Sequence, residues 1–365
     1  MKIIVNSLDL NDAISKVSKA LPARDVAPVL ECIKVTAEND KLTFFATDKD
    51  LAIEKTVDAN VIVGGAMLVP GRVFGDYIRG TDTEVSLETE DNRLTISTSG
   101  SECNITTMNV EDYPEIEEIS NESYFTIQEI NLKEIINNVI FSVATDDSRP
   151  MLKGVFFEAD GYTLTAVATD GYRFAMSKKA LEEKAENISA TIPARSLSEL
   201  SKLLEDSENL LRVFVEKNYL SVVLANTRLQ TRLLVSGQYI RYDNIIPKEF
   251  VSTLLVNKEN FERSLNTASI MSRGDKNNLV VLDIEEYNMN ISSTSQYGTA
   301  KENIAISLTG KDVRCAYNAK YLNDCLKVIN AEAIKMQFAQ HNSCVITINN
   351  SDEVLYFILP VKQIV

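Results

Sequence analysis

The sequence lacks tryptophan and has a single histidine, His341, among its 365 residues. Most acid–base and metal chemistry in proteins draws on histidine, so this scarcity argues against a histidine-dependent enzyme or a metal site. No phosphate-binding glycine loop and no dinucleotide fingerprint occur. We therefore predict no metal and no cofactor, although a carboxylate-only enzyme is not excluded. His341 stands between Gln340 and Asn342 and is expected to be a surface turn residue.

Cysteine is also sparse, and long apolar runs are missing. The opening segment 1–6 has too short an apolar run for a signal peptide. No stretch reaches the ~18 apolar residues that a membrane helix needs. The cysteines are odd in number and share no metal-type spacing, which favours reduced structural thiols in a cytoplasmic protein without membrane partners. They are Cys32, Cys103, Cys315, Cys325 and Cys344.

Basic residues are outnumbered, since 37 Lys and Arg face 52 Asp and Glu, for a net charge of −15. Taken alone, this balance argues against a nucleic-acid partner. The six helices predicted below, with their flanking turns, nevertheless carry a summed charge of +2, which leaves −17 for the rest. Solvated helix faces also carry such bases, so charge alone leaves the question open. No basic stripe or base-reading motif is present, so any contact would be weak and non-specific.

What the chain does have is a repeat. The phrase from Pro28-Val29-Leu30 to Ala46-Thr47-Asp48 returns as Pro150-Met151-Leu152 to Ala168-Thr169-Asp170, a spacing of 122 residues (47 to 169). Val69-Pro70-Gly71-Arg72 returns 123 residues later (70 to 193) and, more faintly, after a further 125 (193 to 318). This period exceeds the ~20–50 residues of a solenoid unit and is the size of a domain.

Each copy has the same order of predicted elements. A strand and a helix with one apolar face come first, the helices covering residues 8–20, 132–140 and 261–268. Alternating strands follow, then a second helix over 72–79, 196–204 or 321–328, then more strands. Each copy is thus α+β, two helices on antiparallel sheet. Acidic, proline-bearing stretches mark the boundaries, giving domains 1–122, 123–249 and 250–365.

The motifs resemble those of a known family. Thr169-Asp170-Gly171-Tyr172-Arg173-Phe174-Ala175 is similar to a segment of the bacterial β sliding clamps, the processivity factors of replicative DNA polymerase. Other similar landmarks, in the same order, are Val69-Pro70-Gly71-Arg72, Leu152-Lys153-Gly154, Tyr242 with Ile246-Pro247-Lys248, and the closing segment from Tyr356 to Lys362. The resemblance covers the whole chain. It implies a non-catalytic homodimer, a head-to-tail ring of six domains around double-stranded DNA.

A size estimate agrees with that ring. A domain of ~120 residues corresponds to a sphere roughly 35 Å across. Three such spheres in a ring leave a hole of about 5 Å, four leave about 14 Å and six leave about 35 Å. Duplex DNA is about 20 Å wide, so one chain cannot encircle it whereas two chains can.

The resemblance also implies a pocket for short linear peptides of the replicative polymerase, the clamp loader, repair polymerases and mismatch-repair proteins. Without it, Phe357–Leu359 would be read as a plain terminal strand. The implied pocket residues are Leu152, Thr169, Gly171, Tyr172, Arg173, Phe174, Ile240, Asn244, Ile245, Ile246, Phe357, Ile358, Leu359, Pro360, Val361 and Lys362.

Two further sets follow from the resemblance. At the seam of the ring, Cys103 and Ile105 of one chain are expected to meet Ile270 and Met271 of the other. The residues expected to face DNA are basic: Arg24, Arg72, Arg79, Arg149, Arg195, Lys202, Arg273, Lys320 and Lys327.

Two alternatives stay open at this point. Plentiful carboxylates allow a carboxylate-dependent hydrolase on a repeated α+β scaffold, which would show paired acids in a cleft. An adhesion-type array of β-domains is a further possibility, which the absence of a signal peptide and the odd cysteine count disfavour.

Overall fold

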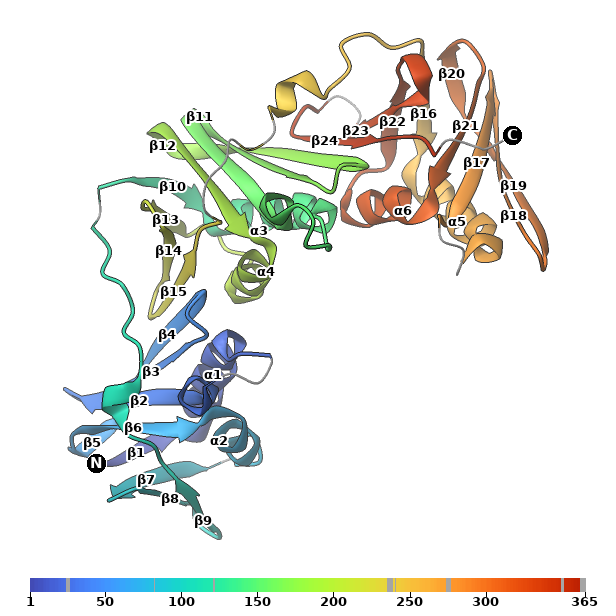
Figure 1. Cartoon of the computed structure of the whole chain (residues 1–365). Helices are drawn as coiled ribbons and strands as arrows, with labels where there is room; N and C mark the ends of the chain where they lie inside the picture. Colours follow the sequence, from blue (N-terminus) through green and yellow to red (C-terminus); the bar gives the residue numbers. More distant parts are fainter. Residues whose placement is uncertain are drawn as a thin grey trace. The chain divides into compact units, whose positions relative to one another are not determined.

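The computed structural model describes residues 1–23, 27–81, 83–120, 122–234, 239, 241–273, 277–348 and 351–361 (Figure 1). Within these ranges each copy of the repeat has two α-helices and antiparallel strands, which confirms the predicted α+β class. None of the helices so described is both long enough and apolar enough to span a bilayer.

The helices lie where the sequence predicts them, with ends that differ by a few residues. Helices α1, α5 and α6 each begin behind an asparagine whose side-chain oxygen accepts a backbone N–H; Asn6 accepts from Leu8 at 2.8 Å. Asparagine suits this place because it satisfies an amide that the helix leaves unpaired. The helices are α1 (Ser7–Val17), α2 (Gly71–Ile78), α3 (Glu129–Val139), α4 (Ala194–Leu203), α5 (Lys258–Ala268) and α6 (Ala319–Val328).

The strands form four antiparallel sheets. The first runs β5 (Asn60–Val63), β1 (Lys2–Asn6), β7 (Glu84–Glu90), β8 (Arg93–Ser97), β9 (Glu102–Thr106). The second runs β10 (Tyr124–Gln128), β13 (Leu210–Val215), β14 (Tyr219–Leu224), β15 (Thr227–Arg232), β4 (Leu51–Asp58), β3 (Lys41–Thr47), β2 (Cys32–Glu38), β6 (Gly65–Pro70). The third runs β11 (Gly154–Thr169), β12 (Arg173–Pro193), β24 (Val354–Ile358), β23 (Cys344–Ile348), β22 (Ala333–Phe338), β16 (Ser252–Asn257), β20 (Ser307–Gly310). The fourth runs β19 (Gly298–Ala305), β18 (Asn288–Ser295), β17 (Leu279–Glu285), β21 (Val313–Asn318).

The chain divides into two compact units, one of residues 1–129 and 202–233, the other of 130–201 and 234–365. The middle copy of the repeat is shared between them. In the first unit its strand β15 pairs with β4, and in the second its strand β12 pairs with β24. We call these pairs the first junction and the second junction. Each continues a sheet from one copy into the next, so that neither strand is left as an open edge.

Helices cover the sheets with their apolar faces. In α1 the buried residues Leu10, Ala13, Ile14 and Val17 recur at three- and four-residue steps, and the helix packs against α2, β3 and β4. Helix α5 packs in the same manner against α6, β18 and β19. This arrangement leaves the polar faces of the helices for contact with solvent or a ligand.

Four of the five cysteines are buried, and the histidine is exposed. All five cysteines are free, and only Cys103 is not fully buried. Burial raises the pKa of the Cys32 thiol to about 11 and that of Cys325 to about 12. Thiols with such pKa values stay protonated and unreactive at neutral pH. His341 is exposed in a turn with φ of 71°, which confirms the surface-turn prediction.

Candidate functional site

The Ala-Thr-Asp phrase of the repeat builds a rigid turn ahead of β12. Thr169 donates its hydroxyl to the carbonyl of Arg173 at 2.7 Å and accepts the N–H of Gly171 at 3.0 Å. Asp170 Oδ1 accepts the N–H groups of Tyr172 and Arg173 at 2.9 and 3.0 Å. Gly171 has φ of +89°, a conformation that glycine adopts without strain. The turn presents Tyr172 to solvent, 60% exposed.

Arg149, expected to face DNA, lies against this turn. Its Nη2 donates to the carbonyl of Asp170 at 2.7 Å. A Cβ atom added at Gly171 would collide with the same guanidinium, which would have to move away from the turn. Arg149 is exposed and therefore still able to meet an anion, but it also supports the turn.

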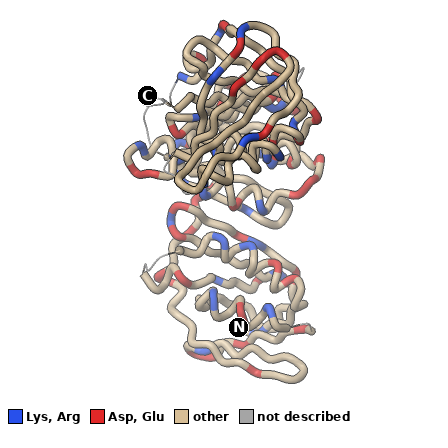
Figure 2. The backbone as a smooth tube through the Cα atoms, turned by 90° about the vertical axis from the view of Figure 1, so that its right-hand side faces the viewer, with Lys and Arg blue, Asp and Glu red and all other residues tan. Residues whose placement is uncertain are grey.

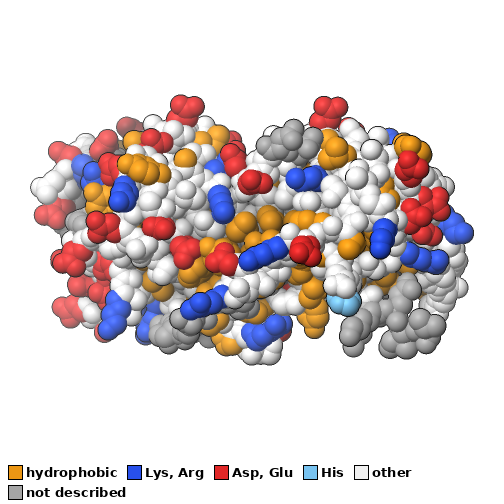
Figure 3. Space-filling model, turned by 90° about the horizontal axis from the view of Figure 1, so that it is seen from above, with side chains coloured by type: hydrophobic (Ala, Val, Ile, Leu, Met, Phe, Trp, Pro, Cys, Tyr) orange, Lys and Arg blue, Asp and Glu red, His pale blue; other side chains and the backbone are white. Residues whose placement is uncertain are grey.

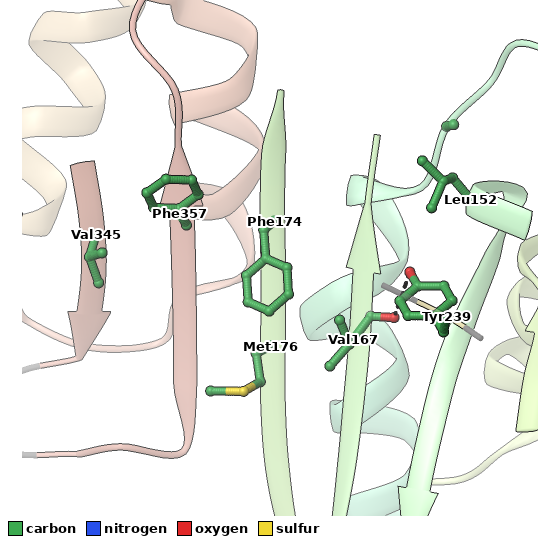
Figure 4. Packing of buried hydrophobic residues seen from close by; sticks show 8 residues of the cluster. Leu152, Val167, Phe174, Met176, Tyr239, Val345 and Phe357 are labelled. Carbon is green, nitrogen blue, oxygen red and sulfur yellow. Dashed lines mark hydrogen bonds between the residues drawn. The ribbon is translucent and has the colours of Figure 1, made fainter. Parts of the chain in front are cut away.

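The second junction places Phe174 of β12 directly opposite Phe357 of β24. Both rings are buried, and they belong to one apolar cluster with Leu152 (Figure 4). Tyr239 closes the cluster on one side and donates its hydroxyl to the carbonyl of Val167 at 3.4 Å. The cluster comprises Ala144, Leu152, Val167, Phe174, Met176, Tyr239, Val345 and Phe357.

Side chains near the end of the middle copy cover part of this cluster. Ile245 and Ile246 pack against it with Tyr242, whose hydroxyl donates to Glu158 Oε2 at 2.5 Å. Burial, followed by this contact with Glu158, raises the pKa of Tyr242 and keeps the hydroxyl protonated.

An exposed rim borders the cluster. Leu359 is 40% exposed, and its N–H donates to the carbonyl of Tyr172 at 3.0 Å. Val361 donates its N–H to the carbonyl of Ala316 at 2.8 Å, and Asn244 is exposed. From above, hydrophobic side chains gather across the middle of the view, flanked by basic and acidic ones (Figure 3). A buried apolar floor with an exposed apolar and polar rim is typical of a groove for a linear peptide.

Arg173 lies outside this cluster, and its side chain is 7% exposed. Its Nε donates to Asp170 Oδ2 at 3.0 Å, Nη1 to Asp324 Oδ2 at 2.7 Å and Nη2 to the carbonyl of Phe141 at 2.6 Å. The guanidinium carbon also lies 4.6 Å from the ring centre of Tyr321. Arg173 therefore fastens the Thr169–Arg173 turn to α6 and has its donors directed into the protein.

Asp324 joins this arrangement to a basic residue of α6. Its Oδ2 accepts Lys320 Nζ at 2.7 Å in addition to Arg173. Burial raises the pKa of the Asp324 carboxyl, but the hydrogen bonds from Lys320 and Arg173 outweigh burial and hold that pKa below its usual value. Asp324 was not among the predicted site residues, because a lone acid in a helix gives no signal in the sequence.

Of the predicted pocket residues, the structure brings Leu152, Phe174, Ile245, Ile246 and Phe357 together in or against the cluster. Thr169 and Gly171 shape the turn beside it. Ile358 is buried but lies outside the cluster, since side chains of a strand alternate between faces. Ile240 and Lys362 lie outside the described residues. Sequence reasoning missed Ala144, Phe156, Val167, Met176, Tyr239, Val345, Phe250 and Leu355, although Val167 and Met176 follow from the same alternation.

The predicted DNA-facing residues are exposed wherever they are described. Arg72, Arg195 and Lys320 each occupy the second residue of their helix, α2, α4 and α6, which confirms their equivalence in the repeat. Basic and acidic residues are interspersed along the chain (Figure 2). Arg24 lies outside the described residues; Arg79, Lys202, Arg273 and Lys327 are exposed at or near helix ends.

The predicted seam residues lie at the outer parts of their sheets. Cys103 is half-buried and Ile105 buried on β9, the edge strand of the first sheet. Ile270 is 51% exposed in a short 3₁₀ turn, Ser269–Ser272, which packs against β18 and β19. The structure holds one chain, so the contact between the two pairs stays a prediction.

Three family models match the chain in succession. They describe the N-terminal, central and C-terminal domains of the DNA polymerase III beta subunit and match residues 1–117, 126–239 and 243–362. A beta sliding clamp of Staphylococcus epidermidis is 31% identical over 97% of this chain and 96% of its own length. The chain belongs to the beta sliding clamp family. The clamp of Halalkalibacterium halodurans is 30% identical over 96% of both chains.

Solved structures agree with this assignment. The sliding clamp of Bacillus subtilis has a TM-score of 0.96 at 26% identity and covers 100% of this chain and 99% of its own. The DNA polymerase III beta subunit of Thermotoga maritima has a TM-score of 0.92 at 28% identity, with 99% of both chains covered. As a beta sliding clamp, the protein is a non-catalytic processivity factor of DNA polymerase III, with DNA and polymerase as partners, and the hydrolase and adhesion alternatives are set aside.

Proposed function

We propose that two copies of this clamp close into a ring of six domains around duplex DNA. Each chain supplies domains 1–122, 123–249 and 250–365, and each holds partner proteins through one peptide pocket. The observation that carries the proposal is the repeated register of the two junctions. Extending that register indicates a third junction, between two chains.

The two junctions pair equivalent residues. At the first, Leu229 of β15 lies opposite Ile53 of β4; at the second, Tyr356 of β24 lies opposite Ala175 of β12. In both cases the last strand of one copy meets the strand that follows the Ala-Thr-Asp turn of the copy before it. The two strands left over in the chain are β9, which ends the first copy, and β19, which follows the corresponding turn in the third. Both are edge strands, which proteins seldom leave uncovered.

Pairing β9 of one chain with β19 of a second chain in the same register sets Cys103 opposite Ala300 of the second chain. It also sets Glu102 opposite Lys301, a pair of opposite charges on exposed positions. Leu229 and Tyr356, the equivalents of Cys103, are both buried, so Cys103 is expected to become buried on ring closure. Ile270 and Met271 lie in the turn packed behind β19, where they can complete the seam with Ile105.

In this ring the exposed bases of α2, α4 and α6 face the duplex, and the net acidic body limits adhesion to phosphates. The cluster around Phe174 and Phe357, with the rim of Tyr172 and Leu359, receives short peptides with apolar anchors. These come from the replicative polymerase, the clamp loader, repair polymerases and mismatch-repair proteins. A cytoplasmic location suits the five free thiols.

Charge exchange at the seam tests the ring. The unsubstituted chain should have a mass near twice 40.6 kDa by light scattering. Lys301→Glu places two acids opposite each other at both seams and should weaken the dimer about tenfold. Adding Glu102→Lys should restore it. If Lys301→Glu leaves the dimer unchanged, or the double variant dimerises no more tightly than Lys301→Glu alone, the register is wrong.

Topological binding is tested separately. Clamp loaded onto nicked circular DNA should be retained through a high-salt wash and released when the circle is linearised. Equal retention on both forms would mean that affinity rather than encirclement holds the DNA.

A further inference from the structure

The first junction binds a segment of its own chain at the place that corresponds to the peptide pocket. At that junction Gln230 lies opposite Ala52, as Phe357 lies opposite Phe174 at the second. Gln230 therefore occupies the position of a central pocket residue. A glutamine amide can bind a peptide backbone, which a phenyl ring cannot.

Gln230 holds the backbone of Glu117, a residue of the linker that leaves the first copy. Its Nε2 donates to the Glu117 carbonyl at 3.1 Å, and its Oε1 accepts the Glu117 N–H at 3.1 Å. Arg228 also donates to that carbonyl, and Nε2 of Gln230 is steadied by Ser221 Oγ at 2.9 Å. Further along, Ser120 donates its N–H to Glu216 Oε1 at 2.7 Å. The linker is thus bound through its main chain, as an extended peptide is.

One apolar side chain of the linker acts as an anchor. Ile116 packs against a cluster of Cys32, Phe45, Ala52, Leu68 and Tyr113. Tyr113 donates its hydroxyl to the carbonyl of Cys32 at 2.9 Å and accepts the N–H of Thr47 at 3.1 Å, so it closes this cluster as Tyr239 closes the other. The floor here is smaller than at the second junction, because alanine stands where Phe174 stands there.

The first junction also has a hollow and charged side chains that a bound peptide could use. Beside the linker lies a hollow of about 270 Å³, and its lining includes Lys49, Asp50 and Arg232. The linker brings the acids Glu115, Glu117 and Glu118 to a wall whose two bases, Lys49 and Arg232, outnumber its one acid, Asp50. The site thereby matches an extended acidic peptide with one aliphatic side chain.

The linker of the middle copy behaves differently. After Tyr239, residues Tyr242–Asn244 turn into a short 3₁₀ helix instead of running on in extended form. Linker residues 114–120 have no helix or strand; Glu117 is hydrogen-bonded to Gln230 of β15, and Ser120 to Glu216, which follows β13. The first linker is therefore extended beside its junction, whereas the second linker forms a short helix.

We propose that the first junction is a second peptide-binding site, kept closed by the chain's own residues Glu115–Ser120, and that it takes extended acidic peptides with an isoleucine-sized anchor. The tethered linker competes at an effective concentration in the millimolar range, which excludes weakly binding peptides in solution. A chain with its linker in place offers one open peptide site rather than two.

The test uses the full-length clamp and a fluorescein-labelled peptide with the sequence of Tyr113–Ser120. In the Ile116→Ser variant the linker has lost its anchor. Hydrogen exchange of residues 117–120 should accelerate at least tenfold, and the peptide should bind at least tenfold tighter than to the unsubstituted clamp. Adding Gln230→Leu, which removes the backbone contacts, should abolish that gain.

A control variant tests whether the gain in peptide affinity belongs to the first junction. Phe357→Gln, placed in the Ile116→Ser background, alters only the second junction and should leave the gain intact. If exchange accelerates without peptide binding, if the gain survives Gln230→Leu, or if exchange does not change, the proposal is overturned. None of these results depends on the peptide pocket at the second junction or on ring closure.

Discussion

The two junctions share one backbone design and differ in the side chains that it carries. At the first, Arg232 donates its N–H to the carbonyl of Asp50 at 2.7 Å; at the second, Leu359 donates to Tyr172 at 3.0 Å. The turns before them are equally alike, since Thr47 repeats the hydroxyl contact of Thr169 with its own turn at 2.9 Å. The repeated phrase therefore encodes a joint between copies.

The side chains then decide what each joint does. Gln230 and Ser221 at the first junction correspond to Phe357 and Val345 at the second. Gln230, which donates to Ser221, holds the chain's own linker by hydrogen bonds, whereas the apolar pair forms part of the floor of a hydrophobic cluster. Polar groups that already hydrogen-bond within the chain contribute little binding free energy to a partner. An apolar surface contributes binding free energy when a partner covers it.

The largest predicted effect concerns the residue that fastens the second junction to α6. Arg173 corresponds to the buried Leu51 of the first junction. Arg173→Ala removes the cation that pairs with partly buried Asp170 and leaves Asp324 with Lys320 alone, a loss of about 3 kcal/mol. Thermal unfolding by circular dichroism should show it, and peptide affinity should fall with it. Arg173→Lys should not rescue, because one ammonium cannot span three acceptors.

This prediction separates two roles for Arg173. A peptide-contacting arginine would lower affinity on substitution and leave the melting temperature unchanged. A fastening arginine lowers both. An unchanged melting temperature together with lost peptide binding would contradict the fastening role.

The next effect comes from giving the second junction the first junction's residue. Phe357→Gln removes a buried ring and leaves an amide opposite Phe174 without the Ser221 and Glu117 groups that serve Gln230. We expect a loss of about 3 kcal/mol in stability. Peptide affinity by fluorescence anisotropy should drop at least tenfold, while the matched Phe357→Leu should lose much less. Equal losses for Gln and Leu would mean that ring shape, not polarity, matters.

Much of the repeat architecture can be predicted from the sequence. The period and the Ala-Thr-Asp phrase predict three copies and their helices, because helix periodicity and turn chemistry are local properties. Pairing across copies is not local. Nothing near Gln230 in the sequence indicates that its amide meets Glu117, 113 positions away.

The site was predicted in part for the same reason. Family resemblance placed Arg173 in the pocket, but burial and its three acceptors show it facing Asp324 and Phe141. A motif records that a residue is needed at a position. It does not say whether the side chain meets a ligand or another part of the fold.

A smaller effect is expected from the converse exchange at the first junction. Gln230→Phe removes two hydrogen bonds to the Glu117 backbone, each contributing about 1 kcal/mol. Amide exchange of residues 117–120 should accelerate, with little change in the global melting temperature, because the linker can open locally. Gln230→Glu, which keeps an acceptor for the Glu117 N–H, should show a smaller acceleration. If amide exchange is unchanged in Gln230→Phe, contacts other than those of Gln230 keep the linker in place.

The smallest effect distinguishes the junctions by pH. Asp324 has a lowered pKa in the folded chain, so its stabilising contribution is present above its ordinary pKa of 3.8 and is lost as pH falls through the lower folded value. Leu51, which replaces Arg173 at the first junction, has no such partner to titrate. The urea midpoint of the clamp should therefore exceed that of Asp324→Asn by a constant margin from pH 5 to 7, and the margin should shrink below about 3.8. Other carboxylates titrate alike in both proteins and cancel in the difference. A margin that persists to the acid limit would show that Asp324 acts by packing, and the contrast between the junctions would then rest on shape rather than charge.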